Sequence, residues 1–219
     1  STLMRSSAAS DVYKRQESAG VVVGVELCED LWVPIPPSSY LVQQGADIIV
    51  NLSATNELIG KHSYLLSLVR QQSARCVAGY VYASAGFGES STDLVFAGNG
   101  LVVENGSILA ESKRFSSTPQ LVVSEIDVER LRTERRVMTS FAKGAWAHGR
   151  DARFIPFVLN DIPLRLTRKV GAFPFVPSDS FVLNERCAEI LDIQSSGLAK
   201  RLVLSLIHIS EPTRLDVIS

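Results

Sequence analysis

The chain has 219 residues, 46% of them hydrophobic, and its 22 basic side chains nearly balance 23 acidic ones. This composition is typical of a globular protein, and the formal net charge of −1 disfavours a surface for nucleic acid or for anionic lipid. No apolar run approaches the ~20 residues that cross a bilayer. Three cysteines without a C-x-x-C pair and three isolated histidines indicate neither a disulfide framework nor a metal site. We therefore expect a cytoplasmic protein without membrane or nucleic-acid partners.

The two ends of the chain, residues 1–16 and 204–219, are predicted to be non-native. Residues 1–16 have neither strand nor helix periodicity. Both segments are similar to translated adapter sequence at the ends of reading frames assembled from environmental DNA. This similarity predicts that the natural protein continued beyond both segments.

The run from Val21 to Val25 predicts a strand that is buried on both faces, because it is β-branched and carries no charge before Glu26. Such a strand delivers Cys28 to its carboxyl end, where α/β folds place their chemistry. A thiol attacks as its thiolate, which backbone N–H groups at a strand-to-helix turn can stabilise. A lone cysteine in an apolar run is more often a small core residue, so the pattern alone leaves both interpretations of Cys28 open.

Further elements follow in order along the chain. We predict helices over residues 39–44, from Ser63, and from Asp127, which caps a helix carrying four arginines. Strands are predicted over residues 47–52, 76–84, 93–97, 101–104, 108–112 and 121–126, with Asn-Gly hairpin turns at 99–100 and 105–106. The arginines favour a solvated or partner-facing helix over an anion site. Residues 139–177, rich in proline, are predicted to be a linker, and a helix is predicted from Glu185.

Four stretches resemble one family. Gly24-Val-Glu-Leu-Cys-Glu-Asp-Leu-Trp is similar to the nucleophile segment of the nitrilase-type glutaminase domain in glutamine-dependent NAD synthetases. The further matches are Asn51-Leu-Ser-Ala-Thr-Asn with Gly60-Lys, Gln72-Ser-Ala-Arg running into Gly79-Tyr-Val-Tyr-Ala-Ser, and Gly88-Glu-Ser-Ser-Thr-Asp-Leu-Val-Phe-Ala-Gly. Residues 175–202 resemble the entry helix of the synthetase half of the same enzymes.

The resemblance implies an α/β fold, a nitrilase-like αββα sandwich that lacks its N-terminal part. It implies a partial glutaminase domain over residues 17–138, the linker over 139–177, and the start of an ATP-pyrophosphatase domain over 178–203. In this family a cysteine attacks the side-chain amide of glutamine, a glutamate acts as general base and acid, and a lysine stabilises the oxyanion. Only the cysteine, Cys28, can be placed in this sequence.

The same resemblance assigns substrate-binding roles to three residues. Glu29 would bind the α-amino group of glutamine, and Thr55 and Lys61 would hold its α-amino acid end. A loop hydroxyl that caps backbone is an equally good interpretation of Thr55, and a plain surface lysine of Lys61. Glutamine, deamido-NAD and ATP are the implied partners of the parent enzyme, with ATP and magnesium belonging to the missing synthetase domain and no cofactor in this fragment. We also expect a homo-oligomer.

Two alternatives remain open. A stand-alone amidase or nitrilase would use the same nucleophile but would not need residues 175–202. A non-catalytic protein on the same fold would carry an unreactive Cys28. Without the general base, which is worth ~10² to 10⁴ in rate, and without the oxyanion lysine, we expect this polypeptide to be inactive.

Overall fold

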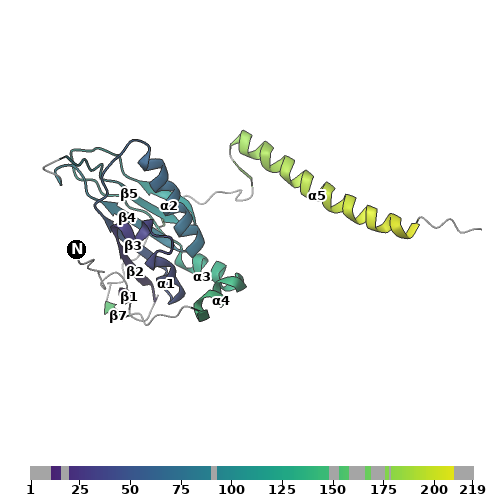
Figure 1. Ribbon diagram of the computed structural model, residues 1–219, viewed down its shortest axis with the longest axis horizontal. Coiled ribbons are helices and arrows are strands. Elements are labelled where there is room, and N and C mark those ends of the chain that lie inside the picture. Colours follow the sequence, from purple (N-terminus) through teal and green to yellow (C-terminus); the bar gives the residue numbers. More distant parts are fainter. Residues whose placement is uncertain are drawn as a thin grey trace, which may run out of the picture. The chain divides into compact units, whose positions relative to one another are not determined.

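The protein is described here by a computed structural model, which places residues 11–15, 20–89, 93–147, 153–157, 166–168, 176–177 and 179–209. The chain divides into two compact units, residues 1–168 and 169–219. The second unit contains helix α5 (Ser180–Ile209) (Figure 1). The elements of the first unit are β1 (Asp11–Arg15), β2 (Val22–Leu27), the 3₁₀ helix η2 (Cys28–Trp32), α1 (Pro37–Gln43), β3 (Ile48–Ser53), α2 (Lys61–Cys76), β4 (Gly79–Ser84), β5 (Gly100–Glu104), β6 (Ser107–Glu111), α3 (Val128–Val137), α4 (Thr139–Ala147) and β7 (Arg153–Phe157).

The described strands of the first unit form one seven-stranded sheet in the order β6-β5-β4-β3-β2-β1-β7. Strands β2, β3 and β4 are parallel neighbours in its centre. Strands β5 and β6 extend one side in antiparallel fashion, and on the other side β1 is antiparallel to β2 and parallel to β7. Because β2, β3 and β4 run in the same direction, their carboxyl ends meet at one edge of the sheet.

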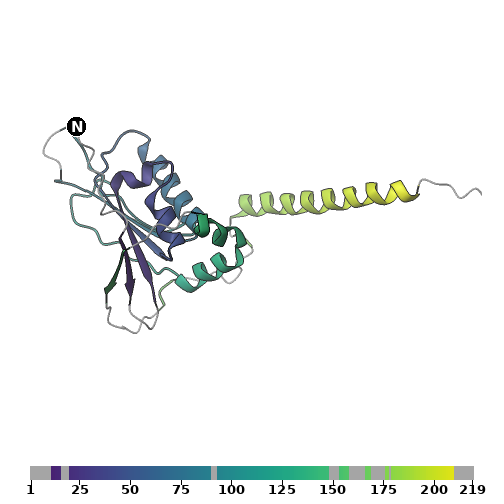
Figure 2. The same cartoon turned by 60° about the horizontal axis from the view of Figure 1, so that its bottom comes forward.

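Helices α1 and α2 lie on one face of this sheet (Figures 1 and 2). Along β2, the residues at 22, 24 and 26 are buried towards the helices, whereas Val23 and Val25 on the other face are half-buried. The expectation of a strand buried on both faces was therefore wrong for the second face of β2. Helix α1 approaches β2 closely at Gly24, where a Cβ atom would lie 2.9 Å from Ile49 Cδ1 and 3.0 Å from Leu41 Cδ1.

The apolar core fills the space between the sheet and these helices. Its largest side chains, Tyr80 and Tyr82, come from β4 and are almost fully buried. The other members of the core are Val22, Leu31, Leu41, Val42, Ala46, Ile49, Leu65, Val69, Cys76, Ala78, Leu101 and Val103. The αββα architecture implies a second sheet, and the residues that the structure describes form only one.

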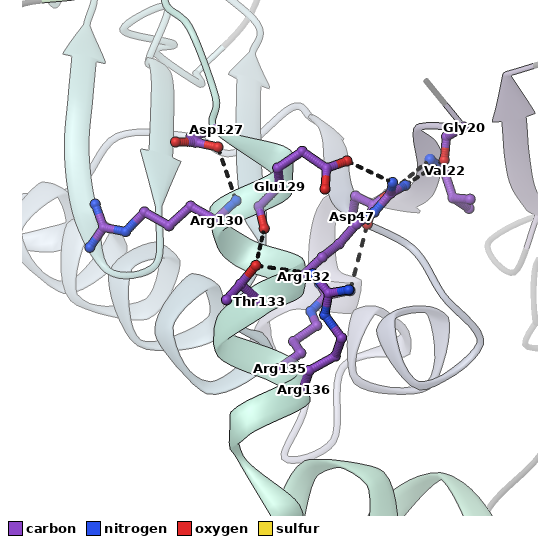
Figure 3. A network of polar contacts seen from close by, with 10 residues as sticks. All are labelled: Gly20, Val22, Asp47, Asp127, Glu129, Arg130, Arg132, Thr133, Arg135 and Arg136. Atoms are coloured by element: carbon purple, nitrogen blue, oxygen red, sulfur yellow. Dashed lines mark hydrogen bonds and ion pairs between the residues drawn. The ribbon is translucent and has the colours of Figure 1, made fainter. Parts of the chain in front are cut away.

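Asp47 ties together the amino ends of the three central strands. Its carboxylate accepts a hydrogen bond from the backbone N–H of Val22 at 2.9 Å, and its carbonyl accepts one from Gly79 at 3.0 Å. Arg132 of α3 reaches the same carboxylate with Nε at 2.9 Å and a terminal nitrogen at 2.7 Å (Figure 3). A second arginine of α3, Arg135, has its Nη1 3.9 Å from Oδ1 of Asp47. Its Nε donates a hydrogen bond to the carbonyl of Val77.

The arginines of α3 therefore correct one expectation. Asp127 caps this helix as predicted, by accepting a hydrogen bond from the backbone N–H of Arg130 at 3.0 Å. Arg132 and Arg135, however, point towards Asp47 and the sheet, so the helix is not simply solvated. Since these two residues are three positions apart, they share one face of α3.

Several predicted elements are confirmed by the structure. Helices α1 and α2, strand β3 and the β5–β6 hairpin with its turn at 105–106 lie close to where the sequence predicts them. The strand predicted over 76–84 is confirmed from Gly79 onward, because Cys76 is the last residue of α2 and Val77 is its C-cap. The predicted strands at 93–97 and 121–126 are wrong, because neither segment pairs with a neighbouring strand. The predicted hairpin turn at 99–100 is also wrong, since Gly100 already belongs to β5.

The structure also differs from the prediction near both ends of the chain. Strand β1 lies within residues 1–16, where no strand was expected, and it pairs with β2 and β7. The predicted linker contains helix α4 and strand β7. Helix α5 begins before Glu185 and continues past residue 203 to Ile209. Residues 1–10, 16 and 210–219 lie outside the described part of the chain.

Among the described helices, none has both the length and the apolar character that crossing a bilayer requires.

Candidate active site

Cys28 stands at the point where β2 ends and the short helix η2 begins. Its backbone has a φ of +45°, a left-handed conformation that costs a non-glycine residue about 1–3 kcal/mol; Val77, Asn105 and Phe115 share it, and such strain is one feature of active sites. Asp30 stabilises the turn, because its carboxylate accepts a hydrogen bond from the backbone N–H of Leu27 at 2.8 Å. The strand-to-helix turn predicted for Cys28 is thus present, and the side chain is partly exposed.

An open hollow of about 560 Å³ lies over Cys28. Its wall comes from the carboxyl ends of β2, β3 and β4 and from the residues that follow them. The contributing side chains that carry a hydroxyl or thiol group are Cys28, Ser53 and Ser84. Cys28 is therefore partly exposed at the edge where the three parallel strands end, rather than enclosed in the core.

Thr55 is the predicted site residue that lies against Cys28. Its Oγ1 is 3.9 Å from the sulfur, and it receives a hydrogen bond from the phenol of Tyr82 at 3.3 Å. The backbone N–H of Thr55 donates to Ser84 Oγ at 3.3 Å. Asn51 adds a long contact of 3.5 Å from its Nδ2 to the carbonyl oxygen of Cys28.

Glu57 anchors the loop that carries Thr55. Its backbone N–H donates to the carbonyl of Val95 at 2.8 Å, and its carboxylate accepts hydrogen bonds from Asn99 and, at 2.9 Å, from Arg114. The carboxylate is largely buried in this arrangement. The position of Thr55 beside the sulfur is thus set by partners that lie 27 and more residues away along the chain, which the local sequence pattern could not indicate.

The other two predicted binding residues make no polar contact with Cys28. Glu29 follows the cysteine and is exposed. Lys61, the first residue of α2, donates from Nζ to the carbonyl oxygen of Asn56 at 2.9 Å and to its side-chain oxygen at 3.1 Å. Its Nζ also lies 5.5 Å from the centre of the Trp32 ring. Lys61 therefore braces the loop between β3 and α2 against η2.

A buried carboxylate lies two residues before the cysteine, and the sequence prediction missed it. Glu26 is fully buried, and its carboxylate accepts hydrogen bonds from the Tyr80 hydroxyl and, at 2.8 Å, from the backbone N–H of Ser38. Burial raises the pKa of Glu26 above its ordinary value, although these hydrogen bonds act in the opposite direction. Its side chain points towards α1, so Glu26 fastens α1 to the sheet.

The remaining cysteines differ from Cys28 in their surroundings. Cys76 is buried and accepts a hydrogen bond from Gln72 at 3.3 Å, and burial raises the pKa of its thiol to about 12. It is therefore protonated at neutral pH and unreactive. Cys187, on α5, is exposed. Within the described residues, no three acidic, histidine or cysteine side chains are grouped to hold a metal ion.

Comparison with known proteins identifies the family. The carbon-nitrogen hydrolase profile matches residues 2–136, and the chain therefore belongs to the carbon-nitrogen hydrolase family. The match includes β1 and the rest of residues 2–16, which the sequence prediction had placed outside the family.

Two mycobacterial relatives match a longer part of this chain than the family profile does. Glutamine-dependent NAD(+) synthetases from Mycobacterium bovis and Mycobacterium leprae are 43% and 42% identical to this chain, over 87% and 84% of its length. The chain spans only 29% and 28% of those proteins. Among solved structures, Nit3 of Saccharomyces cerevisiae, a nitrilase-superfamily member, matches with a TM-score of 0.48 and 20% identity, covering 59% of this chain and 45% of Nit3.

Proposed function

We propose that this chain is part of the glutaminase half of a glutamine-hydrolysing NAD synthetase and that Cys28 is its nucleophile. The observation that carries the proposal is the thiol at the carboxyl end of a central parallel strand, in a strained turn and open to a hollow. The 43% identity to mycobacterial enzymes over most of the chain supports the substrate class.

In the proposed reaction the Cys28 thiolate attacks the side-chain amide carbon of glutamine. The carbon–nitrogen bond breaks as the nitrogen takes up the proton that the thiol gave up, and ammonia leaves. Water then attacks the thioester, which releases glutamate and restores the thiol. A glutamate that moves these protons and a lysine that stabilises the oxyanion are required by the family's chemistry, and no residue of this sequence is assigned to either role.

The proposed substrate contacts follow the family resemblance. Glu29 would bind the α-amino group of glutamine, and Thr55 and Lys61 would hold its α-amino acid end. The positions of Glu29 directly after the nucleophile and of Thr55 beside it support these roles. The ammonia would serve the ATP- and magnesium-dependent amidation of deamido-NAD in a synthetase domain, of which residues 178–203 would form the start.

The first test uses the chain alone. Because no residue of this chain is assigned as the general base or as the oxyanion lysine, we expect no measurable release of glutamate from glutamine. Glutamate release that Cys28→Ala abolishes would contradict this expectation.

The second test restores a complete enzyme. In the M. bovis NAD synthetase, the segment that matches this chain is replaced by the corresponding residues of this chain. We expect NAD synthesis with either glutamine or ammonia, and we expect Cys28→Ala to abolish only the reaction with glutamine. Ammonia-dependent synthesis verifies that the chimera folds. If the ammonia reaction is normal but glutamine is not used while Cys28 is intact, the proposed function is wrong.

A further inference from the structure

The contacts of Thr55 and Tyr82 form a continuous path to the sulfur of Cys28. Tyr82 lies on β4 with 1% of its surface exposed, so core packing fixes the position of its hydroxyl. This hydroxyl donates to Thr55 Oγ1 at 3.3 Å, and Oγ1 lies 3.9 Å from Cys28 Sγ. The three groups thus connect the buried face of the sheet with the partly exposed thiol.

The direction of the hydrogen bond from Tyr82 determines what Thr55 can do, because in the contact between Thr55 and Cys28 either atom can be the donor. A threonine hydroxyl has one proton and two lone pairs. Because Tyr82 donates to one lone pair, the proton of Thr55 is directed away from Tyr82 and can be donated to the sulfur. The remaining lone pair of Oγ1 stays available to the ammonium group of an amino-acid substrate, so this role is compatible with substrate binding.

We propose that Tyr82 is a positioning residue that orients the Thr55 hydroxyl so that it donates a hydrogen bond to the Cys28 thiolate. Thr55 is then a catalytic residue, since it contacts the nucleophilic atom, and Tyr82 acts only through it. The importance of these hydrogen bonds for glutamine hydrolysis rests on the proposed function. Their effect on the thiol is independent of that function, because thiolate reactivity can be measured with a reagent that has no glutamine-like part.

The anchoring of Thr55 explains why a long contact can still act selectively. The backbone N–H of Thr55 donates a hydrogen bond to the hydroxyl of Ser84. Two residues further along the loop, the carboxylate of Glu57 accepts a hydrogen bond from Arg114. These bonds hold the backbone of the loop in place, and the hydrogen bond from Tyr82 directs the hydroxyl. At 3.9 Å the bond to a neutral thiol is weak. Its strength increases when the sulfur becomes negatively charged, because a charged acceptor roughly doubles the strength of a hydrogen bond.

Other charged groups near the turn must be held constant in any test. Near this turn, β2, η2, β4 and α2 carry Glu26, Glu29, Asp30, Lys61 and Tyr80. Each of them has a hydrogen-bond partner or is exposed. None of the substitutions below replaces any of these residues.

The experiment measures the alkylation rate of Cys28 by iodoacetamide from pH 6 to pH 10, in the 219-residue chain carrying Cys187→Ser. We expect Tyr82→Phe to slow the reaction at pH 7 about twofold and Thr55→Val about threefold, by reducing the thiolate fraction. Both should move the midpoint of the pH profile upward. Thr55→Ser should react like the parent chain. Tyr64→Phe, a change at an exposed tyrosine, is the matched control and should have no effect.

The decisive measurement is the double substitution. If Tyr82 acts through Thr55, adding Tyr82→Phe to Thr55→Val changes nothing further. Equal slowing in both backgrounds would show a general structural effect and would overturn the proposal, as would an unchanged pH profile of Tyr82→Phe alone. Because Tyr82→Phe retains the buried ring, circular dichroism and the melting temperature should remain those of the parent. The result is independent of the chimera, which tests the glutaminase function separately.

Discussion

The two ends of the same three parallel strands are built in opposite ways. At the amino ends of β2, β3 and β4, Asp47 binds two backbone N–H groups and Arg132 through contacts of 2.7 to 3.0 Å. At the carboxyl ends, contacts of 3.3 to 3.9 Å join Cys28 to Asn51 and Thr55, and Thr55 to Tyr82, beside an open hollow. The carboxylate at the amino end is held by short hydrogen bonds, whereas the contacts of Cys28 and Thr55 at the carboxyl end are long, although the turn beside them is fixed by short bonds such as that from Leu27 to Asp30.

This difference indicates that the side chains at the amino end of the sheet stabilise the fold, whereas those at the carboxyl end serve the chemistry. Short, charge-assisted hydrogen bonds around a buried carboxylate contribute most when they are all satisfied. A nucleophilic thiol, in contrast, needs neighbours that stabilise its charge without enclosing it. We therefore expect substitutions at the amino end to change mainly the free energy of unfolding, and substitutions at the carboxyl end to change mainly the reactivity of Cys28.

The largest expected effect comes from Asp47→Ala. It leaves the N–H of Val22 without its acceptor and Arg132 without its counter-charge, so we expect a loss of about 3 kcal/mol in the free energy of unfolding. Urea titration followed by circular dichroism measures this loss. The matched control is Glu129→Ala, because Glu129 also pairs with Arg132 but is 77% exposed. Its effect should remain below about 0.5 kcal/mol. Equal losses in the two variants would contradict the special role of Asp47.

The next effect concerns the centre of β2 and depends on pH. Glu26→Gln should lower the free energy of unfolding by about 2 kcal/mol, because the side-chain NH₂ group cannot accept the hydrogen bond from Ser38. The pKa of Glu26 is raised in the folded state, so the folded protein retains its proton more readily than the unfolded chain. The contribution of Glu26 is therefore complete below its ordinary value of 4.5 and declines as the pH rises through the raised value.

Urea titrations of the parent and of Glu26→Gln at several pH values from 4 upward test this dependence. The stability difference between the two proteins should be largest at low pH and should decrease as the pH rises. A difference that grows with pH would show that the carboxylate is stabilised in its charged form, contrary to the burial described above.

The parts of this comparison that local sequence could predict are those that depend on short-range patterns. The β-branched run before Cys28, the helical stripe of α2 and the Asn-Gly turn of the β5–β6 hairpin each specify their element locally. The predicted strands at 93–97 and 121–126 fail because apolar β-branched residues favour extended backbone but do not provide a neighbouring strand to pair with.

The polar contacts at the two ends of the strands could not be predicted from local sequence, because they depend on the fold. Arg132 lies 85 residues from Asp47, and Thr55 lies 27 residues from Cys28. A single carboxylate between Ala46 and Ile48, in an otherwise apolar segment, was a signal that a basic partner must exist, because a buried charge without one is costly. Which arginine supplies the partner depends on how α3 packs against the sheet, and no local pattern encodes that.

The smallest expected effect completes the contrast. Cys28→Ser replaces a half-buried thiol whose contacts are all long, so we expect the free energy of unfolding to change by less than about 0.5 kcal/mol. Urea titration alongside Asp47→Ala provides the measurement. A loss comparable to that of Asp47→Ala would mean that the sulfur is needed for packing. Near-unchanged stability would mean that a strained turn is retained at Cys28 although the thiol adds little to folding, as expected for a residue that serves chemistry.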